Sequence, residues 1–248
     1  MRKEIYIGCA GWTIPKEYRH HFPERGTHLQ RYSHCLNAVE INSTFYRPHR
    51  RSTFERWAAS VPEEFRFAVK IPRSITHQKK LVGCEQELQN FLESIKGLGN
   101  KCGALLLQLP PSLEFHREVI EEFLSLLREK FSGKVVCEPR HHSWFTKEGE
   151  ALLKAFTIAR AAVDPPPHPT ASQPAGDQAI SYFRLHGSPK QYYSEYSIDF
   201  LNTLLDQMLF LAEDHEVWCI FNNTASGAAF KNALQLLDNL SARCQHSV

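Results

Sequence analysis

The sequence lacks the features typical of a secreted, membrane-bound or zinc-binding protein. Its seven cysteines are an odd number with no Cys-x-x-Cys pair, so neither a disulfide framework nor a zinc module is indicated. No apolar run approaches the roughly 20 residues of a membrane-spanning helix. The amino terminus, Met1 to Glu4, leads into a strand pattern without the apolar stretch of a signal peptide. We therefore expect a cytoplasmic protein with no membrane partner.

An excess of one charge and the common cofactor motifs are also missing. Lysine and arginine number 29 against 27 acidic residues, a net charge of +2, which is too mild to predict nucleic-acid binding from overall charge alone. The chain has no phosphate-binding loop, no nucleophile elbow and no His-Glu-x-x-His motif. At 248 residues with 42% hydrophobic content, it is long enough for the core of one large α/β barrel.

Eight short apolar runs alternate with amphipathic helical stretches along the chain. Near-continuous apolar runs are typical of parallel strands covered on both faces, and strand–helix alternation repeated eight times predicts closure into a barrel. We therefore predict an α/β protein with one domain, residues 1–248, folded as a single TIM-type (β/α)8 parallel barrel. The predicted strands are residues 4–10, 37–42, 66–71, 103–109, 134–140, 157–163, 179–186 and 216–222.

The sequence predicts some of the helices clearly and argues against a regular helix at one position. Apolar residues keep helical spacing from Leu88 to Leu98 and from Leu201 to Met208, and Ser52 to Glu55 has the pattern of a capping box that opens the second helix. Between strands six and seven, however, residues 164–170 contain four prolines, too many for a regular helix. We expect the sixth helix to be replaced or shortened by this proline-rich loop.

Polar residues stand at the carboxyl ends of the predicted strands. In a parallel barrel these ends meet at one mouth, where active sites are built. Side chains two positions apart point to the same face of a strand, which pairs Glu40 with Asn42, Glu138 with Arg140, and Arg184 with His186. The candidate residues at the strand ends are Glu40, Asn42, Lys70, Gln108, Glu138, Arg140, Arg184, His186, Asn222 and Asn223.

Three interpretations of these charges are open. In the first, they form a mutually paired plug in which Lys70, Arg140 and Arg184 bridge Glu40 and Glu138, although such a network is costly to desolvate. In the second, they hold a divalent metal, with Glu40, Glu138, Asp164 and His186 as ligands. In the third, they perform metal-free acid–base chemistry. Because lysine and arginine already balance the carboxylates in this space, we predict no metal and no cofactor.

In the acid–base interpretation, Glu138 is the candidate general base and Lys70 or His186 the candidate acid. Glu40 and Glu138 would alternatively form the carboxylate pair of a glycoside hydrolase. Aromatic side chains expected near the mouth would then stack on a sugar; they are Trp12, Tyr46 and Trp144.

The predicted mouth is rich in positive charge. Residues 47–51 follow strand two and contain three arginines, and Arg73, His77, Lys79 and Lys80 follow strand three. With Arg140, Arg184 and Lys190 they would attract phosphate or carboxylate groups, which arginine binds in a bidentate manner. A small anionic or phosphate-bearing substrate is therefore expected.

Several segments together resemble one known family, the domain of unknown function DUF72, also described as YecE-like. The resemblance covers essentially the whole chain and implies a TIM-type barrel, but it implies no particular reaction. Thr224 stands where the family usually has Asp, and His142 where Pro is common. The segments that carry it are residues 7–12, 39–46, 66–70, 75–77, 108–111, 138–145, 184–187 and 221–223.

From these observations we predict an enzyme of unknown specificity that acts on an anionic substrate at the mouth. It would be a hydrolase, a lyase or an isomerase. Glu40, Lys70, Glu138 and His186 are the predicted catalytic residues. The alternatives are a metal-dependent phosphodiester hydrolase, similar to endonuclease IV-type barrels in architecture, and a non-catalytic protein that binds anions or nucleic acid. We expect a monomer or weak oligomer. The remaining side chains are predicted to contact the ligand; they are Trp12, Asn42, Tyr46, Gln108, Arg140, His141, Trp144, Arg184, Asn222 and Asn223.

Overall fold

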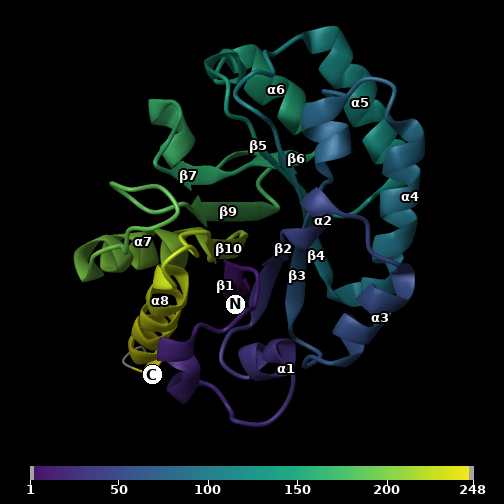
Figure 1. The fold of residues 1–248 in the computed structure, drawn as a ribbon. Helices are drawn as coiled ribbons and strands as arrows, with labels where there is room; N and C mark the ends of the chain where they lie inside the picture. The colour runs from purple at the N-terminus through teal and green to yellow at the C-terminus, as the bar shows by residue number, and fades with distance from the viewer. Residues whose placement is uncertain (1–2, 246–248) are drawn as a thin grey trace.

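The computed structural model describes residues 3–245 and consists of a curved, mainly parallel sheet surrounded by helices (Figure 1). Within the described chain, neighbouring strands are parallel except β6 and β8, in the order β7-β9-β10-β1-β2-β3-β4-β5-β6-β8. The strands are β1 (Ile5–Ala10), β2 (Ala38–Ile41), β3 (Arg66–Lys70), β4 (Cys102–Gln108), β5 (Val135–Glu138), β6 (Ile158–Arg160), β7 (Ala162–Asp164), β8 (Ala175–Gly176), β9 (Ile180–Leu185) and β10 (Glu216–Phe221).

Helices follow most strands and cover the outer face of the sheet. The predicted helices with clear apolar spacing are present as α4 and α7, whose buried leucines and aromatics face the strands. The predicted capping box is wrong, because α3 begins at Arg51 and has no side-chain cap. The α-helices are α1 (His28–Ser33), α2 (Ser43–Tyr46), α3 (Arg51–Ala59), α4 (Glu85–Ile95), α5 (Arg117–Lys130), α6 (Lys147–Ala155), α7 (Ile198–Leu211) and α8 (Ala228–Gln245). None of them is long and apolar enough to span a membrane.

One chain segment supplies a strand to each end of the parallel strand order, and the TIM-type barrel is thereby nearly closed. The sixth predicted strand is divided at Ala161 into β6, which pairs with β5, and β7, which pairs with β9. Between β7 and β9 the chain forms a short 3₁₀-helix (Pro169–Ser172) and β8, with no α-helix. The prediction that a proline-rich loop takes the place of the sixth helix is therefore confirmed.

Two apolar clusters fill the molecule. The larger contains the residues of the helices and of the strand faces that meet them. The smaller contains the alternate strand residues, and it ends where charged side chains begin. Four charged residues at the mouth lie two positions after members of this inner cluster, in the pairs Ala38–Glu40, Ala68–Lys70, Val136–Glu138 and Tyr182–Arg184. Strand alternation thus directs all four charges into the barrel.

Trp218 on β10 fills the inner cluster at the level of Gly103 on β4. Trp218 is fully buried, and its ring packs against Tyr6 at 4.7 Å between centroids. A Cβ atom added at Gly103 would lie 2.5 Å from this indole ring. Glycine is required there because only a residue without a side chain leaves room for the tryptophan.

We therefore expect Gly103→Ala to lower the free energy of unfolding by about 1–3 kcal/mol, the usual cost of overpacking a core. Urea denaturation measures this change. In a double-mutant cycle with Trp218→Phe, the combined loss should be smaller than the sum of the two single losses. Strict additivity would show that Gly103 and Trp218 do not compete for the same space.

Candidate functional site at the barrel mouth

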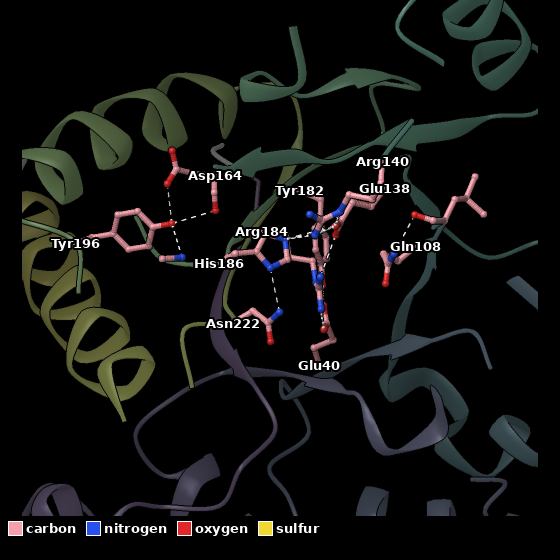
Figure 2. Close-up of polar contacts among 12 residues, drawn as sticks. Glu40, Gln108, Glu138, Arg140, Asp164, Tyr182, Arg184, His186, Tyr196 and Asn222 are labelled. Atoms are coloured by element: carbon pink, nitrogen blue, oxygen red, sulfur yellow. Dashed lines mark hydrogen bonds and ion pairs between the residues drawn. The ribbon is translucent and has the colours of Figure 1, made fainter. Parts of the chain in front are cut away.

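Arg184, at the end of β9, is the centre of a buried ion network (Figure 2). Its side chain is 2% exposed. Its Nε and Nη2 donate to the two oxygens of Glu40 at 2.9 and 2.7 Å, and its Nη1 donates to Glu138 Oε2 at 3.1 Å. The hydroxyl of Tyr182 donates to Glu40 at 3.0 Å. One guanidinium therefore joins the carboxylates of β2 and β5 across the barrel.

The second oxygen of Glu138 is also occupied. It accepts from Arg140 Nε at 2.6 Å, pairs with Arg140 Nη2, and lies 3.3 Å from His186 Nε2. The other ring nitrogen of His186 lies 3.0 Å from the amide nitrogen of Asn222. Both carboxylates of the barrel interior are thus fully engaged by neighbouring side chains.

These contacts determine the charge of each group. Burial acts to raise the pKa of Glu138, but Arg184, Arg140 and His186 outweigh it and hold that pKa well below its usual range. Burial lowers the pKa of His186 to about 4, although Glu138 opposes the shift, so the imidazole is neutral at physiological pH. Such a strongly ionised, paired carboxylate is a weak proton acceptor, and this environment suits an ion-pair partner better than a general base.

Lys70, at the end of β3, differs from the other charges at the mouth. Its side chain is buried, with 8% of the residue exposed. Its Nζ makes no hydrogen bond or ion pair with the described residues and instead lies 4.0 Å from the centroid of the Phe45 ring. Burial and the charge of Arg184 lower the pKa of Lys70 to about 8, against the opposing attraction of Glu40 and Glu138.

Lys70 and the two arginines of the network line a cavity of about 930 Å³. Four of the described residues that line it are lysine or arginine, and none is aspartate or glutamate. The amides of Asn42 and Asn222 also face the cavity, and the Asn42 Oδ1 is buried without a partner among the described residues. The full lining is Ala10, Asn42, Phe45, Tyr46, Lys70, Arg73, His77, Gln108, Pro111, Arg140, Pro167, Arg184, Gln191, Tyr192, Asn222 and Thr224.

The chain after β3 adds a further polar edge to the cavity. It forms a single π-helical turn, Ser74–Gln78. This conformation is rare in proteins, and where it occurs it is often part of a functional site. His77 in this turn packs edge-on against Phe45, and its Nδ1 lies 2.8 Å from the Thr76 hydroxyl. Burial, Lys70 and Arg73 together lower the pKa of His77, so the positive charges on this side of the cavity disfavour protonation of the imidazole.

The structure places most of the predicted catalytic and ligand-contacting residues at the cavity or in the ion network. Those that line the cavity are Asn42, Tyr46, Lys70, Gln108, Arg140, Arg184 and Asn222. Tyr46 is the most exposed of them, at 73%. Glu40, Glu138 and His186 lie directly beneath, in the ion network.

Four predicted contacts point elsewhere. Trp144 is buried, and its indole donates to the Leu113 carbonyl at 2.9 Å, so it packs the core instead of the mouth. Asn223 is likewise buried and donates to the Ser194 carbonyl and to the Asn232 side chain. Trp12 packs edge-on against Trp57 of α3, and His141 binds the hydroxyl of Ser143. Sequence position within a few residues after a strand end does not determine on which side of the rim a side chain lies.

The four side chains considered as metal ligands do not converge on one point. Glu40 and Glu138 accept from Arg184, while Asp164 accepts from the Tyr196 hydroxyl at 2.8 Å, to one side of the network (Figure 2). Among residues 3–245 no group of three or more His, Cys, Asp or Glu side chains is arranged to hold a metal ion. The same pairing leaves neither carboxylate available as the free nucleophile of a glycoside hydrolase.

Two important residues were not predicted from the sequence. Tyr182 donates to Glu40 from the strand that carries Arg184, and Phe45 covers one side of the Lys70 ammonium. Tyr182 lies two residues before Arg184, so alternation along the strand was a usable signal for it. Phe45 lies in the short helix α2, and no periodicity identifies its contact with β3.

Comparison with known proteins gives one consistent family. The family model described as "Protein of unknown function DUF72" matches residues 6–247. The UPF0759 protein YecE of Escherichia coli K12 is 34% identical over 148 residues, 59% of this chain and 52% of YecE. This alignment thus spans about half of the relative's length. The UPF0759 protein YunF of Bacillus subtilis is 25% identical over 95% of this chain and 94% of its own.

A solved structure extends the similarity to three dimensions. The crystal structure of a DUF72 family protein from Thermotoga maritima superposes with a TM-score of 0.80 at 28% identity. The match covers 96% of this chain and 99% of the other. The similarity in fold therefore extends over almost the whole chain.

The unpaired ammonium predicts that Lys70→Met stabilises the protein. Below about pH 8, Lys70 is protonated in both the folded and the unfolded chain, and the folded state bears the cost of burying the charge. Between about pH 8 and 10.4 only the unfolded chain keeps the proton, so wild-type stability rises with pH relative to the variant. We expect a gain of about 1–3 kcal/mol at pH 7 that shrinks toward pH 10, measured by urea denaturation.

Lys101 provides the matched control. It is as buried as Lys70, but its Nζ donates to the carbonyls of Ala58 and Val61 at 2.9 and 2.8 Å. Lys101→Met leaves these acceptors unpaired and should cost about 1–3 kcal/mol. If Lys70→Met were as destabilising as Lys101→Met, the ammonium of Lys70 would have a structural partner after all.

Proposed function

The chain belongs to the family described as protein of unknown function DUF72, and we propose that its barrel mouth is the active site of an enzyme for small anionic substrates. The reaction uses acid–base chemistry with no metal ion. The observation that carries this proposal is the unpaired ammonium of Lys70 beneath a cavity whose described lining holds four cations and no carboxylate.

The charge of the cavity supports an anionic substrate. Glu40 and Glu138 are neutralised by Arg184 and Arg140 below the cavity floor, so the positive charge of Lys70 is not balanced by a partner. Arg73 adds a second cation on the lining. In a partly enclosed site these charges attract phosphate or carboxylate more strongly than they would in open solvent.

Lys70 is the group best suited to transfer a proton. A catalytic acid or base works best when its pKa lies near the operating pH, and burial beside Arg184 lowers that of Lys70 to about 8. The lysine protonates or deprotonates a substrate atom that reaches the cavity floor. We assign proton transfer to Lys70 rather than to Glu138, whose ion pairs keep it ionised.

The remaining polar residues have positioning roles in this proposal. Glu40 and Glu138 hold Arg184 and Arg140 in fixed orientations, so that no reorganisation is needed when an anion binds. The neutral His186 holds the amide of Asn222. The amides of Asn42, Gln108 and Asn222 line the cavity and would orient the uncharged part of the substrate.

Sulfate is a suitable probe, because its charge does not change in the neutral and mildly alkaline range. We expect sulfate to bind and its affinity to fall as pH rises through about 8, where Lys70 loses its charge. Arg73→Gln and Lys70→Met should each weaken binding at least about tenfold, a typical loss for a charged hydrogen bond. Isothermal titration calorimetry at several pH values measures this.

Lys231→Gln is the control, since Lys231 forms an exposed ion pair with Glu195 on the outer surface and should leave sulfate affinity unchanged. Equal affinity in all variants, or a pH-independent affinity, would contradict the proposed anion site.

Lys70→Arg separates an enzyme from a protein that only binds. Arginine keeps the positive charge but is always protonated and cannot exchange a proton near neutral pH. Sulfate affinity should stay within a few-fold of wild type, whereas turnover of phosphorylated or carboxylated compounds, followed by NMR, should fall at least about 100-fold. If the wild-type protein binds these compounds and converts none of them, the proposal that it is an enzyme is contradicted.

A further inference from the structure

We propose that the Nζ of Lys70 is a nucleophile that forms an imine with its substrate, which is an aldehyde or ketone carrying a phosphate or carboxylate group. This rests on the proposed anion-binding site and adds the substrate's reactive group. It is carried by three features: the isolation of Lys70, its placement against Phe45, and the cations that share its cavity.

Apart from its contact with the Phe45 ring, Lys70 has no partner that would give its ammonium a structural role. Lys101 shows how this chain satisfies a buried lysine, with two carbonyl acceptors below 3 Å. Two carboxylates lie on the strands around Lys70, yet Arg184 and Arg140 occupy all their oxygens. The buried ammonium therefore weakens the fold, and such a cost is common where a side chain serves a function.

The surroundings of Lys70 favour the reactive form of the amine. A lysine that is desolvated and placed next to another cation is a nucleophile at neutral pH. With a pKa of about 8, about one Lys70 in ten is neutral at pH 7, against about one in 2,500 for an ordinary lysine. The ring of Phe45 covers one side of Nζ, so attack occurs from the side of the cavity.

The reaction balances without any further reagent. The lone pair of the neutral amine attacks the carbonyl carbon, and the electrons of the C=O bond move to oxygen, which takes the proton released from nitrogen. Loss of the resulting hydroxyl as water, with a second proton from solvent, leaves a protonated imine. The iminium draws electrons from the adjacent carbon and so eases proton removal or bond cleavage there; hydrolysis by water restores the lysine.

The cavity also accommodates the rest of such a substrate. Arg73 and Arg140 line the same cavity as the lysine and would bind the phosphate or carboxylate. Asn42 lines the same cavity, and its buried Oδ1 has no partner among the described residues.

The test is reductive trapping with glycolaldehyde phosphate and cyanoborohydride at neutral pH, followed by mass mapping of the modified lysine. We expect Lys70 to be modified at least about tenfold faster than Lys101 or the exposed Lys231. Lys70→Arg should abolish this product, unphosphorylated glycolaldehyde should react at least about tenfold more slowly at Lys70, and sulfate should compete.

The outcomes separate this inference from the proposed function. If sulfate binds as expected but Lys70 is not trapped, the imine is wrong and the anion site stands. If sulfate does not bind, the proposed function itself fails. Modification spread over surface lysines, or equal rates at Lys70 with the two aldehydes, would overturn the inference. Mapping on the wild-type protein decides this even if a Lys70 variant does not fold.

Discussion

The bond between Arg184 and the two buried glutamates is the interaction on which the rest of the site depends. The Arg184 side chain is 2% exposed, and its guanidinium donates hydrogen bonds to Glu40 on β2 and to Glu138 on β5. Burying these charges is costly unless they are paired and hydrogen-bonded, and here nearly every donor and acceptor is used. Because arginine takes both carboxylates, nothing is left to pair with the lysine on β3.

This division of partners explains why the mouth is positive although the protein is nearly neutral. The carboxylates remain under the floor, and the cavity above is lined by cations, amides and aromatic rings. A plug that served stability alone would pair every charge, or would be replaced by apolar residues. The unpaired lysine departs from that pattern at the position where a substrate would meet the protein, and it therefore carries both the proposed chemistry and the inferred imine.

The barrel fold and most residues of the ion network could be predicted from the sequence, for a physical reason. Strand alternation is strict, so a charge two positions after an inner apolar residue must point inward, as Glu40, Lys70 and Glu138 do. The paired-plug interpretation correctly placed Arg140 and Arg184 on the two glutamates. It also gave Lys70 a part in the bridge, which is wrong because the geometry of Arg184 decides which cation each carboxylate takes. Beyond the strand ends this periodicity no longer applies. There Trp144 lies in the core and Phe45 packs against Lys70, and neither position could be predicted.

The ionisation of Lys70 tests this account most directly. NMR titration of the lysine side chains, with Lys70 assigned by comparison with Lys70→Arg, reports its pKa in the folded protein. The account predicts a value of about 8, well below the other lysines, because burial and Arg184 disfavour the charged form. A value near 10.4, the ordinary lysine pKa, would mean that a carboxylate pairs with Lys70 and that the network is not arranged as described.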